Sequence, residues 1–160
     1  MGLLNKTELY ASDINTNAID AAKAGVYKYK FNISYLDNFD KVIRNDMHNP
    51  LIVRDIPYKK YFEIDQIGDK IKMNKNLLEK PFFAKLDLVK DKNLFQVTFD
   101  LILCRNVIIY FNYNLQNKVF QLFHNNLHEN GFLMLGVHES IKNPFTEKFE
   151  KQGYYYLRKS

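Results

Sequence analysis

The chain has 160 residues, of which 46% are hydrophobic and 26% are charged, so it is expected to fold as one globular domain and not to be a disordered tail. Its formal net charge is +5, from 23 Lys and Arg against 18 Asp and Glu. Basic and acidic residues alternate through residues 59–91, and only residues 142–159 are locally basic. Alternation of this kind indicates a solvated surface, so we expect no nucleic-acid partner.

The cysteine content and the hydropathy indicate in which cellular compartment the protein is expected. Cys104 is the single cysteine, so no intrachain disulfide can form and a reducing cytoplasm fits best. No apolar run approaches the roughly 20 residues that cross a bilayer, and the N-terminus lacks a signal-peptide pattern. We therefore predict a cytoplasmic protein without membrane insertion.

The first predicted elements are a strand and a helix. Residues 8–12 form a short β-prone run that ends at Asp13. Asn15 or Thr16 can then cap a helix, and Gly25 stands where a left-handed helix stop is expected. The apolar positions of this helix recur every four residues, at Ile14, Ala18 and Ala22.

The middle of the chain is less regular. Residues 26–80 contain Pro50, Pro57 and many Asn and Asp. Weak alternation in residues 61–64 and 70–73, on either side of Gly68 and Asp69, predicts a β-hairpin. Residues 82–86 form another predicted strand, which ends at Asp87.

The clearest pattern lies in the second half. Residues 99–104 are nearly all apolar, as expected for a strand covered on both faces. A helix is expected after Asn112, then a buried strand at residues 132–137 and a last, antiparallel edge strand at residues 154–157. The apolar face of the helix is predicted to contain Leu115, Val119, Leu122, Phe123 and Leu127. Strands that alternate with helices predict an α/β domain with a largely parallel sheet.

Polar residues follow three of these strands. They are Asp13, Asp87 and the pair Arg105 and Asn106. Ligands of such sheets bind beyond the carboxyl ends of the strands. A carboxylate such as Asp13 can accept hydrogen bonds from both hydroxyls of a ribose, and Asp87 is placed to bind an adenine amino group, with Leu88 adding backbone groups and an apolar face.

Simpler interpretations remain open for these residues. Asp13 is equally well a helix cap, and Arg105 can pair with a nearby carboxylate. Tyr110 and Phe111 fit a hydrophobic core, and Cys104 fits an inert buried thiol.

Two histidines have the spacing of a helical metal pair. His124 and His128 are four residues apart, but they lack the intervening Glu of a zinc protease and any evident third ligand. We therefore predict no metal site.

Two segments resemble a known family. Tyr10-Ala11-Ser12-Asp13-Ile14-Asn15, followed by an alanine-rich helix and Gly25-Val26-Tyr27, is similar to a region of CheR-type chemotaxis receptor glutamate methyltransferases. The string Phe-Asp-Leu-Ile-Leu-Cys-Arg-Asn-Val-Ile-Ile-Tyr-Phe at residues 99–111 is a near-verbatim match to the most distinctive segment of that family. The resemblance runs from about Leu9 to Leu157.

The resemblance implies a fold and a domain arrangement. The expected fold is a Rossmann-like class I methyltransferase sheet, mostly parallel with an antiparallel last strand, over residues 1–160. A small β-hairpin subdomain is expected at residues 58–74. The first strand and the N-terminal helical domain of the family are not matched, so the resemblance implies a catalytic domain truncated at its N-terminus. Since that first strand normally lies in the middle of the sheet, we expect one of two outcomes: residues 9–12 pair directly with residues 101–104, or a strand is borrowed from another copy in a strand-exchanged homo-oligomer.

The resemblance also implies residue roles. The implied cofactor is S-adenosylmethionine, with S-adenosylhomocysteine as the product. Asp13 matches the ribose-binding acid, Asp87 and Leu88 match the adenine contacts, and Arg105 and Asn106 match cofactor contacts. Arg105 and Tyr110 also match the catalytic residues that face the methyl group and the incoming glutamate. Because residues 138–140 depart from the usual arrangement of the family, Glu139 receives no role.

The implied reaction methylates glutamates on the cytoplasmic domains of methyl-accepting chemotaxis receptors. A glutamate with a pKa of about 4.3 is already an anionic nucleophile at neutral pH, so the transfer needs alignment and no general base. One alternative is a non-catalytic receptor-binding or split-protein fragment of the same fold. Another is a related methyltransferase that acts on a different carboxylate or on a small molecule.

Overall fold

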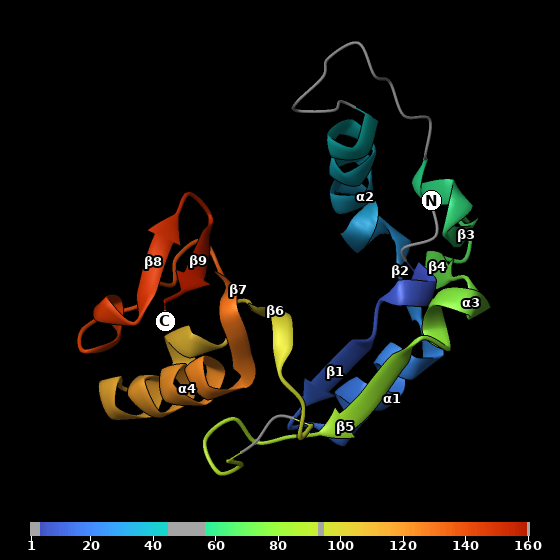
Figure 1. Cartoon of the computed structure of the whole chain (residues 1–160). Coiled ribbons are helices and arrows are strands. Elements are labelled where there is room, and N and C mark those ends of the chain that lie inside the picture. Colours follow the sequence, from blue (N-terminus) through green and yellow to red (C-terminus); the bar gives the residue numbers. More distant parts are fainter. Residues whose placement is uncertain (1–3, 45–56, 93–94, 160) are drawn as a thin grey trace. The chain divides into compact units, whose positions relative to one another are not determined.

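A computed structural model describes residues 4–44, 57–92 and 95–159. The chain forms two compact units, which divide between Lys85 and Leu86 (Figure 1). Each unit is described by itself. Strands and helices alternate in both, which confirms the predicted α/β class.

The first unit contains the predicted βα unit. Strand β1 (Leu9–Asp13) pairs in parallel with β5 (Pro81–Lys85), so that Asp13 lies opposite Lys85, and helix α1 (Thr16–Ala24) packs against both strands. A short 3-10 turn, Leu4–Lys6, precedes β1. The predicted apolar face of the helix is wrong, because Ile19 is the buried residue of α1 whereas Ile14 precedes the helix and is 58% exposed.

The ends of α1 are those that the sequence predicted. The side chain of Asn15 accepts a hydrogen bond from the N–H of Asn17 at 2.9 Å and caps the first turn. Gly25 ends the helix with a φ of 62°, and its N–H donates to the carbonyls of Ala21 and Ala22. A side chain at Gly25 would be strained by this φ and would also meet Leu78, so glycine is needed here for two reasons.

A small antiparallel sheet completes the first unit. Its strand order is β2 (Val26–Lys28), β4 (Lys70–Met73), β3 (Phe62–Asp65), so the expected hairpin strands form and β2 adds a third. Three further helical segments accompany it: α2 (Tyr29–Arg44), α3 (Lys75–Leu78) and the 3-10 turn Tyr58–Lys60. A small core of Leu36, Tyr58 and Ile71 joins α2 to the sheet. That residues 58–74 are an inserted subdomain stays a prediction.

The second unit is a four-stranded mixed sheet in the order β6-β7-β9-β8. Strand β6 (Phe99–Cys104) is parallel to β7 (Leu127–Leu135), and β9 (Tyr155–Arg158) is antiparallel to both β7 and β8 (Phe149–Gln152). The expected last strand is therefore antiparallel, but β8 and not β9 lies at the edge. The 3-10 turns Ile108–Tyr110 and Phe145–Glu147 complete the unit.

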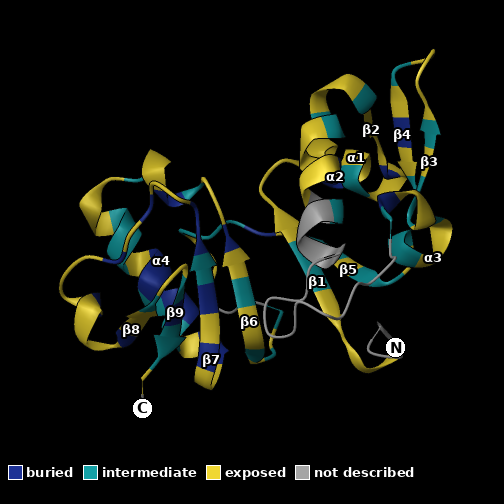
Figure 2. Cartoon of the chain, turned by 90° about the horizontal axis from the view of Figure 1, so that it is seen from above, coloured by how far each residue is buried: buried dark blue, intermediate teal, exposed yellow. Residues whose placement is uncertain are grey.

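Helix α4 (Tyr113–Asn126) supplies most of the core of this unit. Asn112 caps it, and Val119, Phe120 and Phe123 have almost no exposed surface. These side chains pack with Leu127 and Leu133 of β7 in one apolar cluster. Figure 2 shows the buried stretches of α4 and β7 in dark blue. Burial of several large apolar side chains, each worth about 1.5–3 kcal/mol, holds helix and sheet together.

Strand β6 is covered on one face only, which corrects the expectation of two covered faces. Cys104 is buried and Ile102 is half-buried, whereas Leu101 and Leu103 on the opposite face are 49% and 63% exposed. The physical reason is that helix α4 packs on one face of this sheet. Strand β6 is also the edge strand of its sheet, and β1 pairs only with β5 among the described residues of its unit, so each of these strands has an edge without a described partner in its own unit.

Candidate functional site

Asp13 ends β1 with an exposed carboxylate. Its Oδ1 accepts a hydrogen bond from the N–H of Asn15 at 2.8 Å, which shapes the turn into α1. Within the described residues no partner is found for Oδ2. The capping and the ligand-binding interpretations are therefore compatible, since one oxygen serves the turn and the other can accept from a ligand.

Asp87 and Leu88 open the second unit. The N–H of Val89 donates to Asp87 Oδ1 at 2.9 Å, and that of Lys90 donates to it at 3.3 Å. These backbone hydrogen bonds, that of Val89 first, hold the pKa of Asp87 below its usual value. Leu88 is half-buried against the apolar cluster. Oδ1 of Asp87 therefore serves its own loop, and Oδ2 lies 3.6 Å from Nζ of Lys90, which leaves less of the carboxylate for a ligand than sequence reasoning assumed.

The segment after β6 carries the predicted catalytic residues. Arg105 is exposed, and its guanidinium makes no ion pair or hydrogen bond with any described residue. Ile108 is 2% exposed and anchors the segment, whereas Tyr110 is 80% exposed. The interpretation of Tyr110 as a core aromatic is thus wrong. A cation and a phenol that have no polar partner among the described residues therefore lie within six residues on one short segment.

Sequence reasoning missed Glu139, which organises this turn. The side chain is buried, and its carboxylate accepts four backbone N–H groups: Asn106 at 2.8 Å, Val107 at 2.8 Å, Ile109 at 3.2 Å and Gly136 at 2.6 Å. Burial by itself raises the pKa of Glu139, but the four hydrogen bonds outweigh it, so the pKa lies below its usual value. The only signal in the sequence was an acidic residue three positions after the glycine that follows a buried strand.

Gly136 leaves room for this carboxylate. A Cβ at that position would come within 2.5 Å of Asn106 Oδ1 and 2.7 Å of Glu139 Oε2. Any larger residue would therefore push apart the two side chains that meet there.

The thiol and the histidines play no part in this turn. Burial, with a smaller contribution from the charge of Glu139, raises the pKa of Cys104 to about 12, which confirms an inert thiol. His124 lies in α4 and packs edge-on against Phe149, whereas His128 lies in β7, so the two do not share a helix face. No group of three or more metal-binding side chains occurs among the described residues.

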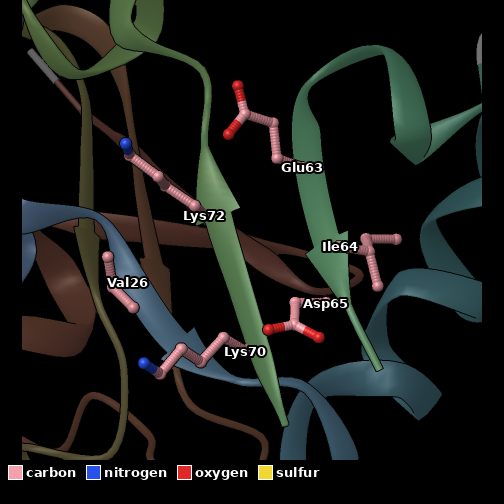
Figure 3. A pocket seen from close by; sticks show the side chains of 6 residues that line it. All are labelled: Val26, Glu63, Ile64, Asp65, Lys70 and Lys72. Carbon is pink, nitrogen blue, oxygen red and sulfur yellow. The ribbon is translucent and has the colours of Figure 1, made fainter. Parts of the chain in front are cut away.

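A separate hollow of about 460 Å³ lies on the small sheet of the first unit. Figure 3 shows its lining, in which Glu63 stands opposite Lys72 and Asp65 opposite Lys70 on neighbouring strands, with Val26 and Ile64 beside them. None of the predicted site residues lines it.

Comparison with known proteins decides the family. The family described as CheR methyltransferase, SAM binding domain, matches residues 44–156. The chain belongs to this family. The CheR-type resemblance is thus confirmed, and S-adenosylmethionine is the methyl donor that such a domain binds.

Individual relatives agree with this assignment. The chain is 35% identical over 151 residues to the methyltransferase Cher3 of Pseudomonas putida, which covers 93% of this chain and 50% of the relative. It is 28% identical over 141 residues to a chemotaxis protein methyltransferase of Borreliella burgdorferi, covering 86% of this chain and 42% of the relative. For chemotaxis protein methyltransferase 1 of Vibrio cholerae, the identity is 28% over 151 residues, or 93% and 47% of the two chains. The CheR-type chain therefore spans about half the length of these curated relatives.

The residues of this CheR-type domain fit the methyl donor chemically. Asp13 offers a carboxylate oxygen of the kind that accepts ribose hydroxyls, and Arg105 and Tyr110 offer unengaged polar groups. None of the described helices has the length and apolar character to span a membrane.

Proposed function

We propose that the protein transfers a methyl group from S-adenosylmethionine to glutamate side chains on the cytoplasmic domains of methyl-accepting chemotaxis receptors, and that it acts in the cytoplasm. The observation that carries this proposal is the turn after β6, where Arg105 and Tyr110 are exposed and have no polar partner in the described part of the chain, while Ile108 and Glu139 hold the backbone. The names of the chemotaxis methyltransferase relatives support the receptor as the substrate.

The residues act on the substrate carboxylate. The donor, when bound, supplies a methyl group on a positively charged sulfur. A guanidinium at Arg105 can hold one oxygen of a glutamate carboxylate, and the phenol of Tyr110 can donate a hydrogen bond to it. The other oxygen would then remain free to accept the methyl group that the bound donor would supply, with the neutral thioether S-adenosylhomocysteine as the second product. No proton moves, so the protein's task is orientation.

The cofactor contacts are part of the same proposal. Asp13 is proposed to bind the ribose hydroxyls, and Asp87 and Leu88 to contact the adenine. Arg105 and Asn106 complete the proposed contacts, with Asn106 acting through its side chain because its N–H already donates to Glu139.

Calorimetric titration of S-adenosylhomocysteine into the chain tests this proposal. Asp13→Ala should weaken binding by a factor of about ten, which is about 1.4 kcal/mol. Asp13→Asn keeps an acceptor for the N–H of Asn15 and separates the loss of charge from the loss of the turn. Asp20→Ala, an exposed acid on α1, is the matched control and should bind like the unmodified chain. A folded chain that binds no S-adenosylhomocysteine would overturn independent cofactor binding.

A second candidate function rests on the hollow of the small sheet. Its carboxylates on β3 and ammonium groups on β4 would suit a peptide with both charges. In that case the chain would be a non-catalytic receptor-binding module, or one part of a split protein. Such a module binds receptor peptides without affinity for S-adenosylhomocysteine, so the same titration separates the two functions. Methylation of another carboxylate or of a small molecule would appear only in a substrate assay.

A further inference from the structure

Four backbone N–H groups at the C-terminal ends of β6 and β7 converge on one side chain. Asn106, Val107 and Ile109 come from the segment after β6, and Gly136 follows β7. Convergent N–H groups of this kind normally form a site for a bound anion. Here the anion is the chain's own carboxylate, Glu139, so these donors are not available to a phosphate or another ligand.

The backbone conformation of the segment needs support. Asn106 has a φ of 59°, a left-handed conformation that is rare for residues other than glycine. This reversal directly follows Arg105 and turns the chain into the 3-10 turn that carries Tyr110. Hydrogen bonds to an ionised acceptor are the stronger kind, and two of them flank the strained residue, at its own N–H and at that of Val107.

We propose that Glu139 is a positioning residue, whose carboxylate fixes the conformation of residues 105–110 and thereby the orientation of Arg105 and Tyr110 for methyl transfer. This inference rests on the proposed function for its catalytic consequence, but its structural part stands on the hydrogen bonds alone. Gly136 is part of the same arrangement, because a Cβ at this position would displace the carboxylate of Glu139 and the side chain of Asn106.

Amide hydrogen exchange followed by NMR tests the structural part. In the unmodified chain, the N–H groups of Asn106, Val107, Ile109 and Gly136 should be protected. In Glu139→Gln, which keeps the size but loses an acceptor oxygen and the charge, their exchange should rise about tenfold or more, with α4 amides such as Phe120 unchanged. Glu129→Gln, an exposed acid in β7, is the matched control and should change none of them. The proposal would be overturned if the four amides were equally protected in Glu139→Gln and Glu129→Gln. It would also be overturned if Glu139→Gln lowered the protection of the α4 amides as much as that of these four.

A pH titration gives a spectroscopic signature of the same four hydrogen bonds. The amide shifts of Asn106, Val107, Ile109 and Gly136 should move together in the acid range as Glu139 takes up its proton. Glu139→Gln should abolish this shared transition. Four independent transitions, or one that persists in the variant, would contradict the assignment.

Kinetics tests the catalytic part. With receptor as substrate, Glu139→Gln and Gly136→Ala should lower kcat by about tenfold or more, because Arg105 and Tyr110 are misdirected. Gly136→Ala should also raise the KM for S-adenosylmethionine, because it displaces the side chain of Asn106, a proposed cofactor contact, whereas Glu139→Gln should change this KM less. If the unmodified chain methylates no receptor, the proposed function fails, whereas the exchange experiment still decides the role of Glu139. If Glu139→Gln kept full methylation activity although its four amides exchanged faster, the positioning role would be overturned.

Discussion

At the scale of single residues, Arg105 is a cation without a structural partner among the described residues. A side chain that stabilises nothing in the fold can be replaced at little cost to stability. We expect Arg105→Lys to fold normally and to lower kcat/KM for receptor methylation about 10–100-fold, because an ammonium lacks the planar fork that fits a carboxylate. Arg105→Ala should lower it further.

The control for Arg105 is Lys118→Ala, an exposed cation on α4. A steady-state methylation assay, together with a thermal unfolding scan, measures both variants. An unchanged kcat/KM in Arg105→Ala would show that Arg105 takes no part in the proposed chemistry. A large fall in the Tm of this variant would show that Arg105 has a structural role, which its contacts in the structure do not indicate.

Cys104 provides a second test at this scale. Burial raises the pKa of its thiol to about 12, so at about pH 8 the folded chain holds almost no thiolate. We expect no reaction with a disulfide reagent under native conditions and one thiol per chain after unfolding in guanidinium chloride. Rapid native labelling would show that β6 opens or that the thiol is not buried.

Residue-level prediction succeeded where the cause was local. Asn15, Gly25 and Cys104 are each explained by a turn, a helix end or an apolar run that is visible in a short window of sequence. Glu139 could not be found in this way, because its hydrogen bonds to the segment after β6 join residues 30–33 positions apart. A carboxylate whose partners are backbone N–H groups leaves no complementary residue type in the sequence.

At the scale of elements, the ionised Glu139 ties the end of β6 to the end of β7. Its pKa is lowered in the folded chain, so its contribution to stability is present above the unfolded value of about 4.3 and is lost as the pH falls through the folded value. Urea unfolding at about pH 7 and about pH 4 should show this loss, and Glu139→Gln should flatten the pH dependence. The same slope in both chains would place the acid sensitivity elsewhere.

Gly25, at the C-terminal end of α1, and Gly153, between β8 and β9, form a matched pair for substitution. Gly25 and Gly153 have nearly the same φ, 62° and 61°, but a Cβ at Gly25 would meet Leu78 whereas one at Gly153 would meet nothing. Gly153→Ala should cost about 1–2 kcal/mol for the left-handed conformation alone. Gly25→Ala should cost more, and the difference in unfolding free energy measures the contact with Leu78. Equal costs would mean that Leu78 moves aside freely.

Element-level prediction failed where tertiary contacts override the local pattern. The bounds of β6 follow from its apolar run, but its burial on both faces does not, because a strand's neighbours are not encoded in its own residues. Helix α2 was not predicted, because the Asn and Asp residues in and around it are typical of loops. It is nevertheless amphipathic: Leu36 and Ile33 pack on the small sheet, whereas Phe31 and Tyr35 are 73% and 65% exposed. Strand β8 is short and mostly polar, and pairing with β9 stabilises it.

At the scale of the whole molecule, each of the two units has a strand edge that lacks a partner in its own unit. Among the described residues of each unit, β1 pairs only with β5 and β6 only with β7. Edges with free N–H and C=O groups beside apolar side chains tend to pair with other strands, and Leu101 and Leu103 of β6 are such side chains. The chain also spans about half the length of its curated relatives, so its whole-protein activity is best tested beside a full-length relative.

We therefore predict that the chain self-associates through strand exchange at these edges. Sedimentation velocity over a range of concentrations should show a shift from monomer to dimer or larger species. Leu103→Lys places a charge on the exposed face of β6 and should move this shift to higher concentration, as lysines on edge strands do. Ile67→Lys replaces an exposed apolar residue of the β3–β4 turn and should leave the association unchanged, so it controls for general hydrophobicity. A chain that stays monomeric throughout would show that the edges of β1 and β6 are satisfied without a second copy.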